Sequence, residues 1–195
     1  MRSKIPEKLL AIVEEIDARG CANLTRLTVL KKWFERPDRL PAFGLWVAQR
    51  SAGHKGRTKG PAGALLDEAH ALLGSTAARG QPAVDRRAAL SLHDRARDFQ
   101  NEPEQHRWAS VRIIHCWPLL LVEKGLALHL RLEDSPTAGY KLAADFCQHY
   151  DPKYGNSLCG PGRTKIMEIV RFMFTVEATE DDPGRPAIPE TATIH

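Results

Sequence analysis

Cysteine and histidine side chains in the last third of the chain are of the types that bind a metal. Cys147 and His149 are separated by one residue, and Cys159 follows ten residues after His149. Zinc accepts both kinds of ligand, and His115 or Cys116 would complete such a site. However, the spacing matches no standard zinc finger, and there is no second close pair. We therefore expect no metal site and no cofactor.

The same residue types are considered next as nucleophiles. A catalytic thiol needs a base held beside it, and His115 and Cys116 are neighbours in the sequence. Adjacent side chains on a helix or strand point in different directions, so this pair is not a nucleophile with its base. We expect no catalytic residue. An enzyme that uses the Cys/His group near residues 147–159 remains the third and least favoured reading.

A glycine-rich basic segment, AGHKGRTKG at residues 52–60, has the composition of a phosphate-binding loop. It holds three glycines together with Lys55, Arg57 and Lys59. Glycine lets backbone amides approach an anion, and the basic side chains supply positive charge. The spacing is not that of a Walker A loop. Two readings stay open for this segment: a phosphate-gripping loop, which we favour, and a solvated linker.

Positive charge is concentrated in the first third of the chain. Residues 1–60 contain thirteen Lys and Arg against six Asp and Glu, whereas the remainder contains fifteen against eighteen. This asymmetry is typical of proteins with an anionic partner such as nucleic acid. An ordinary solvated surface would show the same excess.

Three short helices are predicted in this basic region, at residues 6–18, 24–35 and 39–51. Each has apolar residues at helical spacing, and Asp38 is expected to cap the third. Together they have the dimensions of a helix-turn-helix domain, whose second helix would carry Arg26, Lys32 and Arg36 toward a major groove. A plain three-helix scaffold is the alternative interpretation.

The function that these observations favour is binding of DNA or RNA without catalysis, and a subunit of a nucleoprotein assembly is one form that such a protein takes. Contacts would be mainly to phosphate and would depend steeply on salt. The rival is a protein–protein adaptor whose basic surface meets an acidic partner. The residues predicted to contact nucleic acid are Arg26, Lys31, Lys32, Arg36, Arg50, Lys55, Arg57 and Lys59.

The densest apolar stretch, residues 108–132, must be covered by the other elements because it carries few charges. Pro118 is expected to end or kink a helix near Trp117. After it, Leu126, Leu128, Leu130 and Leu132 alternate with other residues as in a strand, so a small hairpin over 118–132 is one prediction. The residue types favour the other, a buried helix that begins at Pro118.

The remaining segments predict a mainly α, multi-helix bundle. Helices are expected at residues 61–73, 84–100 and 136–149, with Ser135 capping the third, and a last helix starts at Pro161. We divide the chain into a basic three-helix unit with its loop (1–60), a helical body (61–178) and a flexible acidic, proline-rich tail (179–195). Because no apolar run is long enough to span a membrane and no secretory signal is seen, we expect a cytoplasmic protein without membrane contact.

Overall fold

The computed structural model describes residues 32–53, 60–74, 84–102, 109–150, 166–173 and 176, and for 109–116 and 148–150 the backbone only. These residues are mainly helical, and no strand occurs among them. A mainly α fold is therefore confirmed. The named helices are α3 (Leu40–Ala52), α4 (Pro61–Gly74), α5 (Arg86–Asn101), α7 (Ala109–His129) and α8 (Pro136–Tyr150), and residues 166–173 are also helical.

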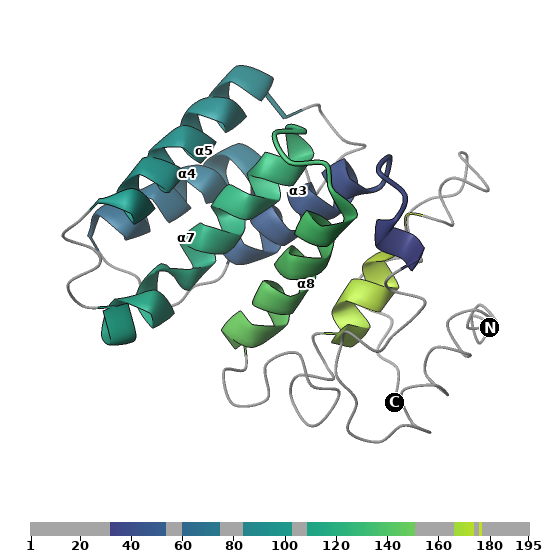
Figure 1. The fold of residues 1–195 in the computed structure, drawn as a ribbon. Helices are drawn as coiled ribbons and strands as arrows, with labels where there is room; N and C mark the ends of the chain where they lie inside the picture. Colours follow the sequence, from purple (N-terminus) through teal and green to yellow (C-terminus); the bar gives the residue numbers. More distant parts are fainter. Residues whose placement is uncertain are drawn as a thin grey trace, which may run out of the picture.

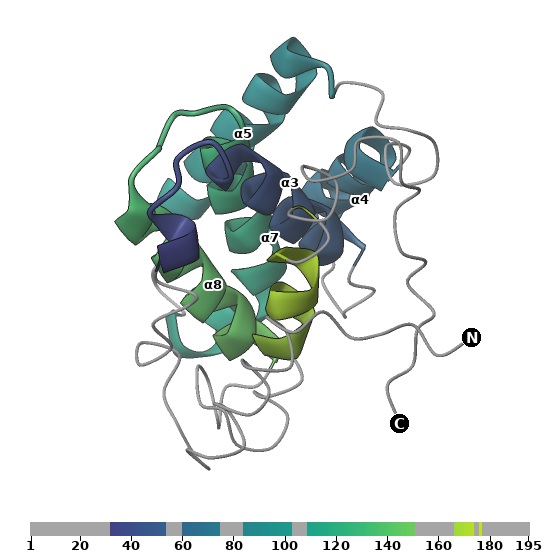
Figure 2. The ribbon, with the colours of Figure 1, turned by 90° about the vertical axis from the view of Figure 1, so that its right-hand side faces the viewer.

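The helices form three layers, with α3 and α7 in the middle (Figures 1 and 2). On one side, α4 and α5 pack against this central pair. On the other side lie α8 and the helical residues 166–173. Helix α7 contacts all four other named helices, and its most extensive contact is with α3. The apolar stretch at 108–132 is thus the element around which the described fold is built.

Two groups of buried side chains fill the spaces on either side of the central pair. They are separate because α3 and α7 each bury one face toward α8 and another toward α4 and α5. The first group contains Phe34, Leu40, Phe43, Val47, Leu121, Leu128, Leu142, Phe146, Ile166, Ile169 and Val170. The second contains Ala48, Leu66, Ala69, Leu73, Ala89, Leu92, Ala96, Leu119, Val122, Leu126 and Leu130.

Glycines allow the two central helices to cross at backbone contact. A Cβ atom on Gly125 would lie 2.5 Å from the carbonyl oxygen of Gly44 and 3.0 Å from the Cβ of Ala48. A Cβ on Gly44 would likewise overlap the carbonyl oxygen of Gly125. Only glycine permits this approach at both positions.

Helix α7 begins at Ala109 and continues through Pro118. Of the two alternatives expected near Trp117, a helix end or a kink, the helix end is therefore wrong, and so is the expected helix start at Pro118. The hairpin alternative is also not formed, because residues 118–129 are helical. A proline inside a helix costs about 3 kcal/mol. Burial of Leu119, Leu121 and Val122, at about 1.5–3 kcal/mol each, exceeds that cost. Long-range packing therefore decides this element, and the helical preference of the residue types is confirmed.

The turn from α7 to α8 shows how local sequence ends one helix and begins the next. Arg131 adopts a left-handed conformation with φ 59°. The amide of Leu132 donates to the carbonyl of Ala127 at 2.8 Å, and that of Arg131 donates to Leu128 at 3.1 Å, which is a Schellman termination. The Ser135 hydroxyl then accepts from the Ala138 amide at 3.1 Å and caps α8, as predicted.

The predicted helix-turn-helix unit is not confirmed. Residues 6–18 and 24–31 lie outside the described residues, and 32–34 are helical. The third predicted helix exists as α3, with Leu40, Phe43 and Val47 buried as expected. Its N-cap is Arg39, which makes no side-chain capping bond, so the expected cap at Asp38 is wrong. Helix α3 packs chiefly on α7. The predicted division had placed α3 in the N-terminal unit and α7 in the helical body.

Candidate functional site

The structure places three of the eight predicted nucleic-acid contacts, and it divides them between the two ends of α3. Lys32 and Arg36 precede the helix, and Arg50 is in its last turn. With thirteen residues, α3 is about 20 Å long, so the two groups do not form one patch. The other five predicted contacts lie outside the described residues: Arg26, Lys31, Lys55, Arg57 and Lys59.

At the N-terminal end of α3, the positive charge of Arg36 is offset by a neighbouring carboxylate. An Nη of Arg36 donates to Asp38 Oδ2 at 3.0 Å, and both side chains are about half exposed. This hydrogen bond holds the pKa of Asp38 below its usual value, so Asp38 stays ionised. Lys32, four residues before Arg36 in the sequence, is also exposed. This end offers a mixed rather than a purely positive surface.

At the C-terminal end of α3, Arg50 is exposed and lies over the ring of Trp46, with 6.0 Å between the guanidinium carbon and the ring centroid. Helix α3 is fastened here to the end of α4, because the side-chain amide of Gln49 donates to the Leu73 carbonyl at 3.2 Å. The chain leaves α3 at Gly53 and enters α4 at Gly60, whose φ is 75°. Residues 54–59, which carry the predicted basic loop, join these two points.

The first turn of α4, at Pro61, is at the other end of this helix from Leu73, about 18 Å away along the helix axis. Its first intrahelical bond is from the Ala64 amide to the Gly60 carbonyl at 3.1 Å, and no acidic residue occupies the first turn. The partial positive charge of a helix N-terminus favours anions, and exposed first-turn amides donate to them. The start of α4 therefore favours an anion through its dipole, although Pro61 has no amide hydrogen to donate, and it is a separate place from the end of α3 that carries Arg50.

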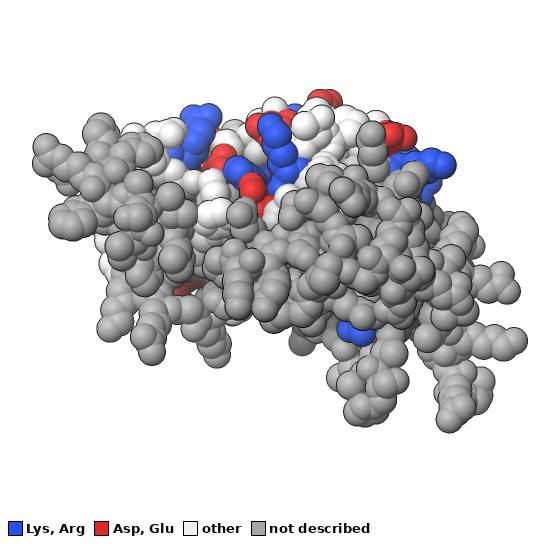
Figure 3. All heavy atoms as spheres, turned by 60° about the horizontal axis from the view of Figure 1, so that its bottom comes forward, with Lys and Arg blue, Asp and Glu red and all other residues white. Residues whose placement is uncertain are grey.

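Elsewhere the described surface carries both signs of charge. Most of the face in Figure 3 consists of residues that are not described, and among the described ones Lys and Arg side chains stand beside Asp and Glu side chains. Along α5 opposite charges also alternate, because Arg97 lies 3.8 Å from Asp94 and 3.9 Å from Asp98. The predicted ion-paired surface of α5 is thus present.

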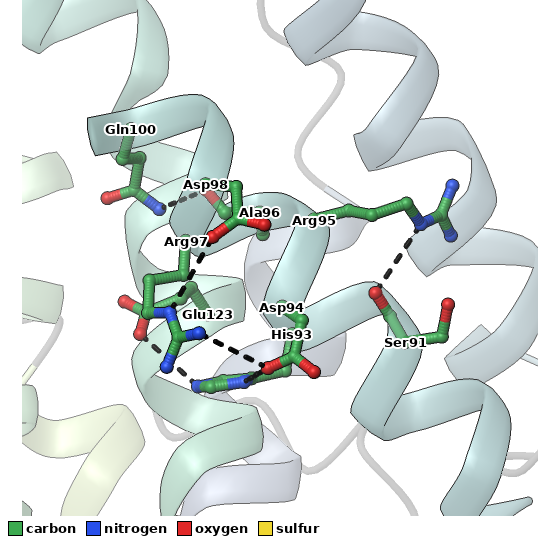
Figure 4. A network of polar contacts seen from close by, with 9 residues as sticks. All are labelled: Ser91, His93, Asp94, Arg95, Ala96, Arg97, Asp98, Gln100 and Glu123. Atoms are coloured by element: carbon green, nitrogen blue, oxygen red, sulfur yellow. Dashed lines mark hydrogen bonds and ion pairs between the residues drawn. The ribbon is translucent and has the colours of Figure 1, made fainter. Parts of the chain in front are cut away.

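A buried polar cluster between α5 and α7 was not foreseen from the sequence (Figure 4). His93 is 4% exposed, and its Nδ1 lies 3.0 Å from an oxygen of Asp94 on the same helix. Its Nε2 lies 3.4 Å from Glu123 Oε1 on α7. Burial raises the pKa of Glu123, although the nearby His93, Lys124 and Arg97 oppose that shift.

This cluster has no nucleophile among its described contacts. Both ring nitrogens of His93 face carboxylate oxygens, whereas covalent catalysis needs a hydroxyl or thiol beside the base. A sequence signal for the buried histidine did exist. His93 follows Ala89 by four residues and precedes Ala96 by three, so it lies on the same helical face as these buried alanines.

Two further ion pairs tie the outer helices to their neighbours. The guanidinium of Arg95 on α5 pairs with Glu68 on α4, and this hydrogen bond raises the pKa of Arg95. Lys124 on α7 pairs with Asp145 on α8 at 2.6 Å. The indole N–H of Trp117 donates to the Asp145 carbonyl at 3.0 Å. These contacts explain how α5 and α8 are held in position on α4 and α7.

A hollow of about 450 Å³ lies between the end of α7 and the start of α8. Lys124 and Lys141 line it together with Glu133 and Asp134. Charges of both signs therefore face the same open depression, and Lys124 already pairs with Asp145. The hollow shows no preference for an anion or a cation.

The residues considered for a metal site are not brought together in the described structure. Cys147 is a fully buried thiol in α8, while the side chain of His149 and the whole of Cys159 lie outside what is described. Within the described ranges, no group of three or more His, Cys, Asp or Glu side chains is arranged to hold a metal ion. Across the same ranges, no helix combines the length and apolarity that crossing a membrane requires.

Comparison with protein-family models, with curated proteins and with solved structures found no match to this chain.

Proposed function

We propose that this protein binds nucleic acid without catalysing a reaction, and that it grips the phosphate backbone at the junction of α3 and α4. The observation that carries the proposal is the position of Arg50, an exposed cation at the end of α3 where the chain enters the basic loop. Lys55 follows Gly53 by two residues and Lys59 directly precedes Gly60, so covalent connection keeps Lys55 near the end of α3 and Lys59 near the start of α4.

The α4 N-terminus adds a second source of attraction for phosphate. The helix dipole at this end of α4 favours an anion beside Lys59 and Gly60, whereas Arg50 and Lys55 lie at the other end of the basic loop and would meet a different phosphate of the same nucleic acid. Lys32 and Arg36, at the far end of α3, would then meet a different part of a long nucleic acid. Because Arg36 already pairs with Asp38, we expect a weaker contribution from that end.

The test compares salt dependence among variants that lose the same number of charges. In the junction variant, Arg57 and Lys59 are changed to glutamine. In the control variant, Arg87 on α5 and Lys141 on α8, both exposed, are changed in the same way. A plot of log affinity against log salt should lose about one unit of slope for each phosphate contact removed.

We expect the junction variant to reduce this slope by about two units and the control variant to leave it near that of the unmodified protein. A third variant, with Lys32 and Arg36 changed to glutamine, reports on the other end of α3. Equal slopes in the junction and control variants would show that the junction does not grip phosphate.

A protein–protein adaptor with an acidic partner is the competing function. It predicts no binding to random oligonucleotides at low salt, together with salt-sensitive capture of one discrete acidic protein. The same junction variant distinguishes the two, because it would weaken the protein complex while oligonucleotide binding would be absent in every variant.

A further inference from the structure

The guanidinium of Arg50 lies on an aromatic ring that is itself fixed by packing. Arg50 follows Trp46 by four residues, about one helical turn, so the two side chains share a face of α3. The guanidinium carbon is 6.0 Å from the centroid of the Trp46 ring. That ring is stacked on Phe172, with centroids 4.9 Å apart, and on Phe43, with centroids 6.0 Å apart. Trp46 therefore has little freedom to move away from Arg50.

A similar pair before the start of α3 is buried. Arg39 lies over Trp33, with 5.4 Å between the guanidinium carbon and the ring centroid. Arg39 is only 6% exposed and Trp33 only 5%, so a ligand cannot reach this pair. Arg50, by contrast, is exposed, and Trp46 is half-buried. Within the part of the chain that the structure describes, the pair formed by Arg50 and Trp46 is therefore the cation–aromatic pair that is open to a ligand.

We propose that Arg50, supported by Trp46, stacks against an unpaired base, so that the nucleic acid bound at the end of α3 is single-stranded. This inference rests on the proposed binding of nucleic acid and adds to it the class of strand. A guanidinium is planar, so a base can stack on its face while its N–H groups donate to a phosphate. The bases of a duplex are stacked on one another, and a base has to leave that stack before it can lie on Arg50.

Phosphate contacts alone predict the opposite preference. A duplex carries its phosphates at a higher density than a single strand does, and each phosphate contact releases more counterions from it. A protein that contacts only phosphate therefore binds a duplex at least as tightly as a single strand. Stacking uses the flat face that every base has, so it changes which strand is preferred without adding a dependence on base sequence. The preferred strand thus separates the two modes of binding.

The test measures binding of the full chain to three labelled oligonucleotides by fluorescence anisotropy at about 50 mM salt. They are a single strand of mixed sequence, the corresponding duplex, and a single strand with the same number of phosphates but no bases. Arg50→Lys keeps the positive charge and removes the planar group. Arg87→Lys is the matched control, because Arg87 is an exposed arginine on α5.

We expect the unmodified protein to bind the single strand more tightly than the duplex or the base-free strand. Arg50→Lys should weaken binding of the single strand by about fivefold more than binding of the base-free strand, and Arg87→Lys should not distinguish the two. The salt dependence should stay the same in both variants, because neither loses a charge.

Two results would overturn stacking while leaving phosphate binding in place. One is binding of the duplex by the unmodified protein that is as tight as binding of the single strand, or tighter. The other is an equal effect of Arg50→Lys on the single strand and on the base-free strand. Absence of binding to all three oligonucleotides would overturn the proposed function and this inference together.

Discussion

At the scale of single residues, the contact between Gly44 and Gly125 is the tightest constraint on the described fold. In an open helix position, replacing glycine by alanine stabilises a protein by about 1 kcal/mol. At Gly125 the new Cβ would meet the Gly44 carbonyl oxygen at 2.5 Å, and that backbone atom cannot move without separating α3 from α7. We predict that Gly125→Ala lowers the free energy of unfolding by about 2 kcal/mol, measured by urea denaturation.

Gly74→Ala provides the control for this effect. There the nearest atom to a new Cβ is a ring carbon of the exposed His70 at 3.4 Å, which is an ordinary contact. Little or no loss of stability is expected. If Gly125→Ala and Gly74→Ala raised the free energy of unfolding by similar amounts, α3 and α7 would not cross in contact at Gly44 and Gly125.

Residue-level features were predictable where the sequence acts locally. Ser135 before Pro136 correctly predicted a capped helix start, because a cap needs only its own first turn. His93 was missed, since its burial depends on α7 packing against the α5 face that carries it. The predicted cap at Asp38 is wrong because α3 begins one residue later than expected, at Leu40, which makes Arg39 the N-cap.

At the scale of elements, the end of α7 offers a test of how the chain turns toward α8. Arg131 is in the left-handed region, which costs a residue with a Cβ about 1–2 kcal/mol and costs glycine almost nothing. Glycine also loses more chain entropy on folding. We predict that Arg131→Gly raises the free energy of unfolding by about 0.5–1 kcal/mol, measured by thermal or urea denaturation.

Arg131→Ala separates the backbone effect from the lost charge. It removes the same guanidinium and keeps the Cβ, so it should not stabilise the protein. If alanine stabilised as much as glycine does, the left-handed conformation of residue 131 would not be the cause.

The elements themselves were predicted to within a few residues where periodicity was strong. Helices α4, α5 and α8 begin and end close to their expected positions. The stretch around Pro118 was ambiguous because leucines at alternate positions suit a strand as well as a helix. Burial of Leu119, Val122 and Leu126 against α4 and α5 settles it as helix, and a local pattern contains no information about those partners.

At the scale of the whole molecule, the sequence predicted a helical bundle around residues 108–132 but not its layers. Helix α3 belongs to the same central layer as α7 although more than fifty residues separate them in the sequence. This fold also separates the residues predicted to contact nucleic acid, because Arg36 lies before the start of α3 and Arg50 lies in its last turn. The distance between two such residues depends on the length and packing of the helices that carry them, and amino-acid composition does not determine either.

The central claim is that the α3–α4 junction binds the phosphates of a nucleic acid. The most direct measurement is fluorescence anisotropy of labelled single- and double-stranded oligonucleotides of random sequence, at about 50 and 200 mM salt. We predict binding at the lower concentration that weakens by at least tenfold at the higher one, with little dependence on base sequence. Absence of binding to both kinds of oligonucleotide at about 50 mM salt would contradict the claim.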